Sequence, residues 1–254
     1  MMKKLAGIVV FMVGLLLFYG VSNVDDFPGW GDPDSPANAS PLSQYFITDT
    51  IKDSEVPNMV TAVLADYRGY DTMFETVVIF IAGIAIFAVV RVSRNNSPVC
   101  GGNKDDEPDL IITTTCRLLV PVIQIFALYV LAHGHSSPGG GFQGGVIMGA
   151  SFILVAVAWD LDTALGRFSE KAAIACAGLG IIIYAGFGLA SMFYGEEFLN
   201  YGITHKLLPG VESPEMARYY GMLGVEVGVM FTVTSVMFLI YGLLSTRGRM
   251  SGGL

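Results

Sequence analysis

One stretch of glycine, histidine and proline between two long apolar runs constrains the fold more than any other part of the chain. It reads HGHSSPGGGFQGG and covers residues 133–145. A helix cannot continue through it, because proline lacks a backbone N–H group and glycine has a low helix propensity. We therefore predict a tight turn between two membrane helices, called here the glycine hairpin, whose structural residues are Pro138, Gly139, Gly140, Gly141, Phe142, Gly144 and Gly145.

Three of these glycines also fit a nucleotide-binding pattern. Gly139, Gly141 and Gly144 satisfy G-x-G-x-x-G, and Asp160 follows at about the distance expected for a ribose-binding acid. That fingerprint needs a strand before it, whereas an apolar run of membrane-span length precedes these glycines. The sequence therefore favours a structural turn over a nucleotide site.

The glycine hairpin also holds two of the three histidines. His133 and His135 are two residues apart, so on a helix they would point to different faces, and only an extended turn would bring both to one metal ion. His205 is the third histidine. With so few ligands, the sequence favours loop hydrogen bonding or a proton relay, and we predict neither a metal nor a cofactor.

The composition is that of a polytopic membrane protein. Of the 254 residues, 53% are hydrophobic and 14% are charged, whereas soluble domains carry about 25% charged residues. The net charge of −8 comes without a basic patch, so no nucleic-acid partner is expected. The cysteines at 100, 116 and 176 have no C-x-x-C spacing, and we interpret them as free thiols.

Six apolar segments are long enough to cross a bilayer. We expect an all-α fold with membrane helices at about 5–24, 72–92, 110–132, 144–159, 171–194 and 221–244. Between the first two, residues 25–56 form an acidic loop in which prolines favour irregular structure. Residues 57–68 form a short interfacial helix that Pro57 starts and Gly69 ends.

A hydrophilic linker at residues 100–109 divides the chain into two predicted parts. Residues 1–99 would form a two-helix module with the loop and the interfacial helix, and residues 110–254 would form a four-helix domain. Lysine and arginine indicate the orientation. With the N-terminus inside, ten of the 14 lie on the inner side. This predicts cytoplasmic N- and C-termini and places all three histidines on the outer side.

Four carboxylates lie in or at the ends of the predicted spans. Glu226 lies in an otherwise apolar span, where a carboxylate is costly and usually faces the bundle interior or a water path; alternatively, it lies a turn from the surface and reaches toward water. Glu75 lies one turn into the second span beside Asp71 and Arg68, which indicates an ion site or a local ion pair at a helix N-terminus. Asp160 ends the fourth span as a solvated rim or a cation-gathering group.

Glycine spacing predicts close helix packing. Gly145 and Gly149, and likewise Gly224 and Gly228, have the G-x-x-x-G spacing that lets membrane helices approach closely. No nucleophile lies beside an activating base in the sequence, and neither a pair of histidines within the spans nor a cluster of thiolates fits a redox centre. We therefore expect a chain without a catalytic centre of its own.

Two sequence patterns resemble parts of one kind of transport complex. The glycine hairpin resembles the signature H-G-H-x-S-P-G-G-G-F-x-G-G of the MnhB/MrpB family, the B subunits of multisubunit sodium/proton antiporters. The glycine–acid–glycine pattern around Glu226 is similar to that family's last helix, and the resemblance covers about residues 110–248. Residues 58–61 and 66–75 resemble the tail of the large A-type chain of the antiporter, where the second stretch has the pattern D-[FY]-R-G-[FY]-D-T-x-x-E. The same unit is also a small separate MbhE-like chain of membrane-bound hydrogenases.

The resemblance implies an accessory subunit of a complex that exchanges Na⁺ for H⁺ in the inner membrane of a prokaryotic cell. Its partners would be the lipid bilayer, complex-I-like proton-pumping subunits and other small membrane subunits. The implied ion-path candidates are Asp71, Glu75, His133, His135 and Glu226, to which its position adds Asp160. Two alternatives stay open: a membrane-arm subunit of an energy-converting hydrogenase or related oxidoreductase, and a purely structural helix-packing subunit.

Overall fold

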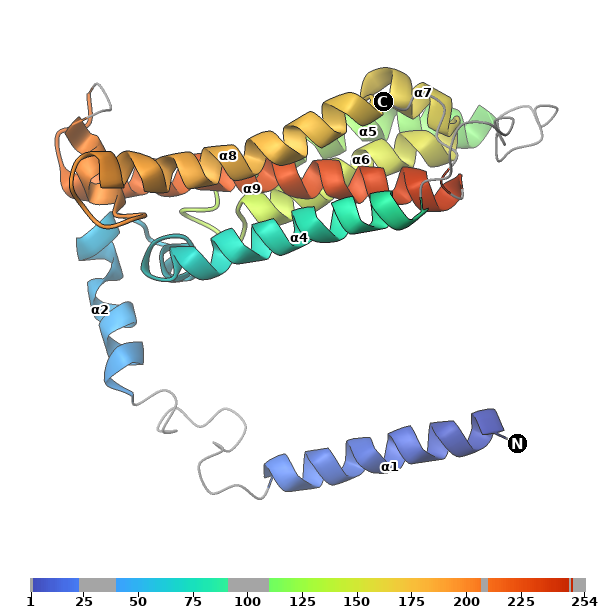
Figure 1. Cartoon of the computed structure of the whole chain (residues 1–254), viewed down its shortest axis with the longest axis horizontal. Coiled ribbons are helices and arrows are strands. Elements are labelled where there is room, and N and C mark those ends of the chain that lie inside the picture. The colour runs from blue at the N-terminus through green and yellow to red at the C-terminus, as the bar shows by residue number, and fades with distance from the viewer. Residues whose placement is uncertain (1, 23–39, 91–109, 207–209, 247, 249–254) are drawn as a thin grey trace. The chain divides into compact units, whose positions relative to one another are not determined.

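The computed structural model describes residues 2–22, 40–90, 110–206, 210–246 and 248, which form helices and no strand. The predicted all-α fold is confirmed. Figure 1 shows the elements in chain order, with η1 a π-helical turn and η2 a 3-10 helix: α1 Met2–Ser22, α2 Pro41–Ser54, α3 Met59–Ala62, η1 Val63–Tyr67, α4 Gly69–Val90, α5 Leu110–Ala132, α6 Gly141–Ala158, α7 Leu161–Arg167, α8 Glu170–Phe193, η2 Tyr201–Lys206 and α9 Pro214–Ser245.

Five of the described helices are long and apolar enough to cross a membrane: α4, α5, α6, α8 and α9. A polytopic membrane protein is therefore confirmed. Helix α1 has 21 residues, but its described apolar stretch, Gly7–Ser22, is shorter than these five. The sixth span and the side of the membrane on which the termini lie stay predictions.

The chain forms two compact units, Met1–Thr50 and Ile51–Leu254. The first unit contains α1. The second contains all five candidate spans, so α4 of the predicted N-terminal module packs with helices of the predicted C-terminal domain. The predicted linker at residues 100–109 lies outside the described residues.

Helix α2 occupies part of the segment in which prolines predicted an irregular loop. The helix begins at Pro41, whose fixed φ suits a first helical turn, and the Ser40 hydroxyl accepts a hydrogen bond from Ser43 N at 3.1 Å. A proline that we interpreted as loop-forming therefore starts a helix. The residues of the predicted interfacial helix form α3 and the π-helical turn η1, so the hydrogen bonds of this segment depart from the regular α-helical pattern in η1.

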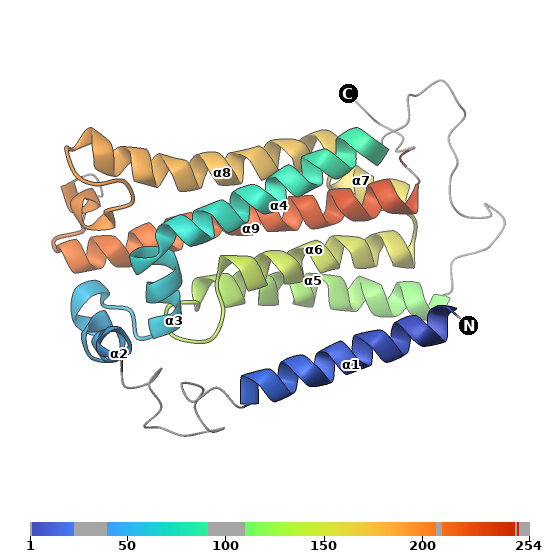
Figure 2. The same cartoon turned by 60° about the horizontal axis from the view of Figure 1, so that its bottom comes forward.

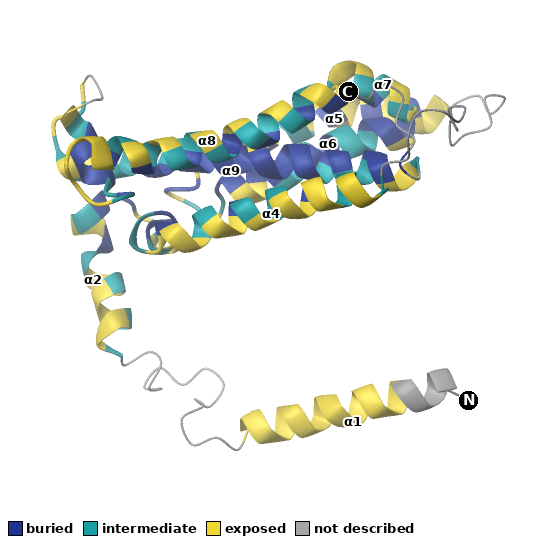
Figure 3. Ribbon diagram, in the orientation of Figure 1, coloured by how far each residue is buried: buried dark blue, intermediate teal, exposed yellow. Residues whose placement is uncertain are grey.

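Four helices of the second unit lie in a row, in the order α8, α9, α6 and α5, and α4 packs across α9 (Figure 2). Helix α9 is the core of this bundle. In its most apolar stretch of 18 residues, 67% of the residues are buried, against 11% in the corresponding stretch of α4. Figure 3 shows the same contrast along the two helices. The outer faces of α4, α5 and α8 expose apolar side chains such as Val78, Ile125 and Ile182, as lipid contact requires.

Helix α9 begins at Pro214 rather than near residue 221, where the apolar run starts. The Ser213 hydroxyl caps it by accepting a hydrogen bond from Met216 N at 3.1 Å, and Pro214 occupies the first turn. Local capping therefore extends the helix into a segment whose polarity suggested a loop. As a result, Glu226 lies about three turns inside the helix instead of one.

Helices α8 and α9 touch through glycine backbone. A Cβ atom on Gly180 would lie 2.3 Å from the Gly228 carbonyl oxygen, and one on Gly228 would lie 2.6 Å from the Gly180 carbonyl oxygen. The Thr232 hydroxyl donates a hydrogen bond across this contact to Ala177 O at 3.0 Å. Direct backbone contact of this kind is possible only without side chains.

The glycine pairs with G-x-x-x-G spacing lie at similar contacts. A Cβ atom on Gly149 would lie 3.2 Å from Thr234 O, and the Thr234 hydroxyl donates to Gly145 O at 3.1 Å, so α6 packs closely on α9. A Cβ atom on Gly224 would lie 2.2 Å from the Phe187 ring of α8. Small residues thus set the spacing of α9 from both neighbours.

We expect Gly180→Ala to lower the free energy of unfolding by about 1–3 kcal/mol, because the added methyl group meets the α9 backbone. Gly178→Ala on the same helix is the matched control, since nothing lies within 4 Å of its Cβ position and alanine favours helix formation. Thermal unfolding of the purified chain in detergent measures both. Equal unfolding midpoints for the two variants would contradict this packing.

Candidate functional site

The glycine hairpin begins where α5 ends and leads into α6. The backbone N–H groups of Ser136 and Ser137 donate to His133 O at 3.1 and 2.9 Å, which closes a turn. Gly140 then has a φ of 139°, in a region that residues with a side chain rarely adopt. This residue caps α6, and its conformation directs the backbone toward α9.

The Glu226 carboxylate is enclosed by this hairpin backbone. A Cβ atom added to Gly140 would lie 2.7 Å from Glu226 Oε1, and one added to Gly134 would lie 3.2 Å from Glu226 Oε2. One added to Gly141 would lie 2.0 Å from the Glu226 backbone oxygen. Glu226 is 8% exposed, and its Oε2 atom makes no hydrogen bond among the described residues. The fold therefore buries a carboxylate that can still bind a partner.

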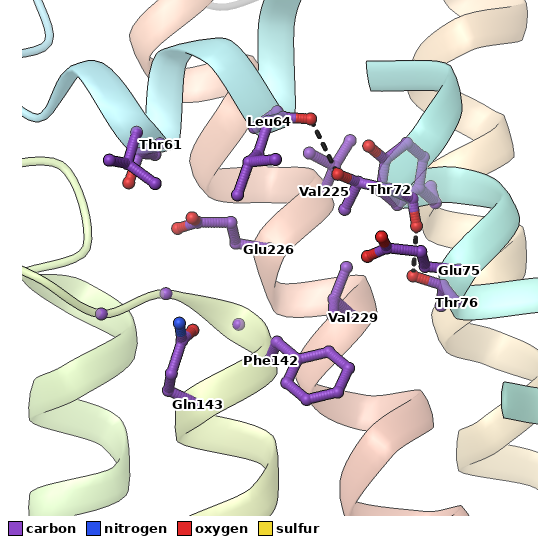
Figure 4. Close-up of a pocket in the computed structure, with 16 residues that line it drawn as sticks. Thr61, Leu64, Thr72, Glu75, Thr76, Phe142, Gln143, Val225, Glu226 and Val229 are labelled. Atoms are coloured by element: carbon purple, nitrogen blue, oxygen red, sulfur yellow. Dashed lines mark hydrogen bonds between the residues drawn. The ribbon is translucent and has the colours of Figure 1, made fainter. Parts of the chain in front are cut away.

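Glu226 faces a cavity of about 270 Å³ that five parts of the chain line: α3 with η1, the start of α4, the glycine hairpin with the start of α6, α8 through Tyr184, and the middle of α9. Figure 4 shows Gln143 extending toward Glu226 from α6 and Glu75 approaching from α4. Val225 and Val229 of α9 supply apolar wall. Two carboxylates and an amide thus share one largely apolar cavity. Glu75 is exposed, whereas Glu226 is buried.

Asn58, the residue before α3, holds the hairpin in place. Its side-chain Nδ2 donates to Gly134 O at 2.8 Å and to Ser137 O at 2.9 Å, and its backbone N–H donates to His135 O at 2.9 Å. The Thr61 hydroxyl also donates to Gly134 O, at 2.7 Å. These bonds satisfy carbonyl groups that a hairpin cannot pair internally.

The two hairpin histidines lie in different surroundings. His135 is 1% exposed and packs on the Tyr219 ring, with 4.2 Å between centroids. Burial lowers the pKa of His135, and the backbone of Tyr219 partly offsets this effect. His133 is exposed and stacks on Tyr129 at 4.1 Å. Among the described residues, no group of three His, Cys, Asp or Glu side chains is close enough to hold a metal ion.

Two of the candidate carboxylates do not line the cavity. Asp71 forms an ion pair with Arg68, and both side chains are exposed, so the pair contributes little to stability. Asp160 caps α7 by accepting a hydrogen bond from Thr163 N. Asp160 follows the C-terminal end of α6, whereas the glycine hairpin that encloses Glu226 precedes the N-terminal end of this helix. Asp160 therefore lies far from Glu226.

A buried ion pair near the cavity was missed by sequence reasoning. Arg218 Nη1 donates to both carboxylate oxygens of Asp66, at 2.9 and 2.8 Å, and the Asp66 side chain is 3% exposed. Burial raises the pKa of Asp66, and the Arg218 charge opposes this rise. No local spacing connects two residues so far apart in the sequence. The role of Asn58 in holding the hairpin was also missed, although its helix-capping position was a readable signal.

Comparison with known proteins identifies the family. A family model described as "Domain related to MnhB subunit of Na+/H+ antiporter" matches residues 111–239. The chain belongs to this family. A second model, described as the E-type chain of MBH, matches residues 35–102, which include Asn58 and the start of α4. The residues that line the cavity thus lie within the two segments that these models match.

Two curated relatives of this MnhB-family chain are named as antiporter subunits. The B-type chain of a Na(+)/H(+) antiporter from Bacillus subtilis is 32% identical over 135 residues, which are 52% of this chain and 94% of that protein. The A/B-type chain of a probable K(+)/H(+) antiporter from Rhizobium meliloti is 26% identical over 190 residues, which are 67% of this chain and 19% of that protein. The chain therefore matches nearly all of the first relative and about a fifth of the second.

Two solved membrane complexes contain similar chains. A chain of the Mrp complex from Dietzia sp. DQ12-45-1b matches with a TM-score of 0.70 and 25% identity, over 99% of this chain and 26% of that chain. A chain of the membrane-bound sulfane sulfur reductase, an archaeal respiratory membrane complex, matches with a TM-score of 0.60 and 26% identity, over 92% and 98%. With its apolar helices and these relatives, the MnhB-family chain is a multi-pass protein of a prokaryotic membrane.

We expect Asn58→Asp to lower the free energy of unfolding by about 1–3 kcal/mol. The change replaces the Nδ2 donor with an oxygen that faces the carbonyl oxygens of Gly134 and Ser137. Ser136→Ala, which removes an exposed hydroxyl from the same hairpin, is the control. The midpoint of thermal unfolding in detergent is the measurement, and a wild-type midpoint for Asn58→Asp would show that the hairpin does not depend on this residue.

Proposed function

We propose that the chain is an integral accessory subunit of a multisubunit antiporter complex that exchanges Na⁺ for H⁺, and that Glu226 and Glu75 contribute to the ion path. The observation that carries the proposal is the buried Glu226 carboxylate, which faces the cavity with an oxygen that has no hydrogen-bond partner in the described part of the chain. The names of the Bacillus subtilis and Rhizobium meliloti relatives support a role in cation/proton exchange.

The chemistry needed for exchange is compatible with one buried carboxylate. A charged carboxylate without a partner is costly in an apolar bundle, so Glu226 is stabilised when it holds a proton or neutralises a cation. A proton and a cation compete for the same oxygen atoms, and the release of one therefore allows the other to bind. Glu75 offers a second carboxylate on the exposed side of the cavity.

The remaining ion-path candidates have different places in this proposal. His135 belongs to the hairpin that covers Glu226, and we assign it a supporting role there. Asp71, His133 and Asp160 do not line the cavity, and we assign them to the surface.

The charge distribution of the sequence supports an outward-facing hairpin. Proton-pumping and small membrane subunits would cover the exposed apolar faces of α4 and α5 that lipid does not.

We expect Glu226→Gln to lower Na⁺-dependent proton exchange by about tenfold or more, because an amide cannot take up and release a proton or neutralise a cation. Glu75→Gln is expected to lower exchange as well. Glu197→Gln, an exposed glutamate of the loop after α8, is the control. The measurement is the dye-reported pH change in vesicles that contain the assembled complex, normalised to the amount of this chain. If both cavity variants exchange normally, the chain has only a structural role.

A second candidate function is a membrane subunit of a respiratory oxidoreductase complex. It is favoured by the match to nearly the whole of one chain in the sulfane sulfur reductase complex and by the match of residues 35–102 to the E-type chain of MBH. The composition of the complex purified through this chain separates the two. Nickel–iron or iron–sulfur proteins in that complex would support the oxidoreductase, and their absence from an active exchanger would support the antiporter.

A further inference from the structure

Two tyrosine hydroxyl groups are buried side by side next to the cavity. Tyr184 of α8 and Tyr201 of η2 are both 0% exposed. Their hydroxyl oxygens would lie 3.8 and 3.5 Å from a Cβ atom on Gly69, so they occupy one small region beside the start of α4. Phenylalanine would fill the same space without a buried hydroxyl group to satisfy. The hydroxyl groups therefore indicate a polar function in an otherwise apolar cluster.

The inner end of this pair reaches the carboxylates. Tyr184 lines the cavity together with Glu75 and Glu226. The Tyr184 hydroxyl donates a hydrogen bond to Gly69 O at 2.9 Å. It is therefore fixed in position, and its residue shares the cavity wall with the two proposed ion-path residues.

The outer end of the pair reaches the Asp66–Arg218 ion pair. The Tyr201 hydroxyl belongs to the element that packs on this ion pair, since a Cβ atom on the next residue, Gly202, would lie 3.5 Å from Arg218 Nε. It makes no hydrogen bond of normal length and angle among the described residues, so it can accept a proton from a neighbour or from water. Arg218 is 30% exposed, which gives the ion pair contact with solvent.

We propose that Tyr201 and Tyr184 form a proton relay between Asp66 and the cavity, an inference that rests on the proposed ion path through Glu226 and Glu75. Tyr201 oxygen receives a proton from the Asp66 side while its own proton passes to Tyr184 oxygen. Tyr184 in turn releases its hydroxyl proton to a cavity carboxylate. Each phenol begins and ends neutral, and rotation of the two hydroxyl groups resets the relay.

The chemistry of the surroundings fits neutral hydroxyl groups. Burial raises the pKa of Tyr201, which disfavours the phenolate and leaves exchange of protons through the neutral group. At the other end of the pair, burial raises the pKa of Asp66 and the Arg218 charge opposes this rise. The relay thus has an acid at each end.

The test removes each hydroxyl group and keeps each ring. Tyr184→Phe and Tyr201→Phe are expected to lower Na⁺-dependent proton exchange per assembled complex by roughly tenfold or more. Because the two groups act in series, the double variant should be no slower than the slower single variant. Tyr241→Phe makes the same chemical change on a tyrosine of α9 that packs against the cluster around Phe238. This variant is the control and should exchange normally.

Four results would overturn the relay. Normal exchange in both single variants, beside lowered exchange in Glu226→Gln, would exclude the relay and leave the proposed ion path intact. Loss of assembled complex without a lower rate per complex would assign the tyrosines to packing. A double variant whose loss is the product of the single losses would exclude one serial route. Equal slowing in Tyr241→Phe would show that the effect is not specific. Normal exchange in both Glu226→Gln and Glu75→Gln would instead reject the proposed ion path.

Discussion

The contact between the glycine backbone of the hairpin and the Glu226 carboxylate is the constraint on which the rest of the site depends. Side chains at Gly134, Gly140 or Gly141 would collide with Glu226 or with neighbouring backbone. Their absence lets irregular backbone lie directly on a membrane helix and cover a carboxylate there. Irregular backbone at such a place must have its polar groups satisfied, and Asn58 and Thr61 do so from a different part of the chain. The cavity exists because the hairpin and these residues enclose it together.

The site is therefore shared between two segments that the sequence separates. Asn58 and Thr61 meet the hairpin, and the Asp66–Arg218 pair joins η1 to α9. The B-type antiporter chain of Bacillus subtilis matches 52% of this chain over 94% of its own length. A buried ion pair is weak support for stability, because desolvation offsets its attraction, but it fixes the register of the partners well. Here it joins η1, which lines the cavity with Leu64 and Ala65, to α9, which lines it with Glu226.

Much of the architecture could be predicted from local patterns. The bilayer fixes the length of apolar runs, and α5, α6 and α8 therefore lie close to the predicted spans. The start of α9 was missed because polarity outweighed the capping signal of Ser213 and Pro214, and for the same reason Glu226 lies deeper than the sequence suggested. Glu226 and Glu75 could be singled out as acids in apolar runs. Their meeting in one cavity, and the parts played by Gln143, Tyr184 and Arg218, depend on packing between distant segments, which no local spacing encodes.

The glycine hairpin is a packed cover over Glu226 and not a solvated loop. Hydrogen–deuterium exchange of the chain in lipid nanodiscs tests this directly, because amide exchange reports local opening. We expect the peptide covering residues 133–140 to exchange as slowly as the core of α9, and much more slowly than the loop after α8 at residues 194–200. A hairpin peptide that exchanges as fast as that loop would contradict it.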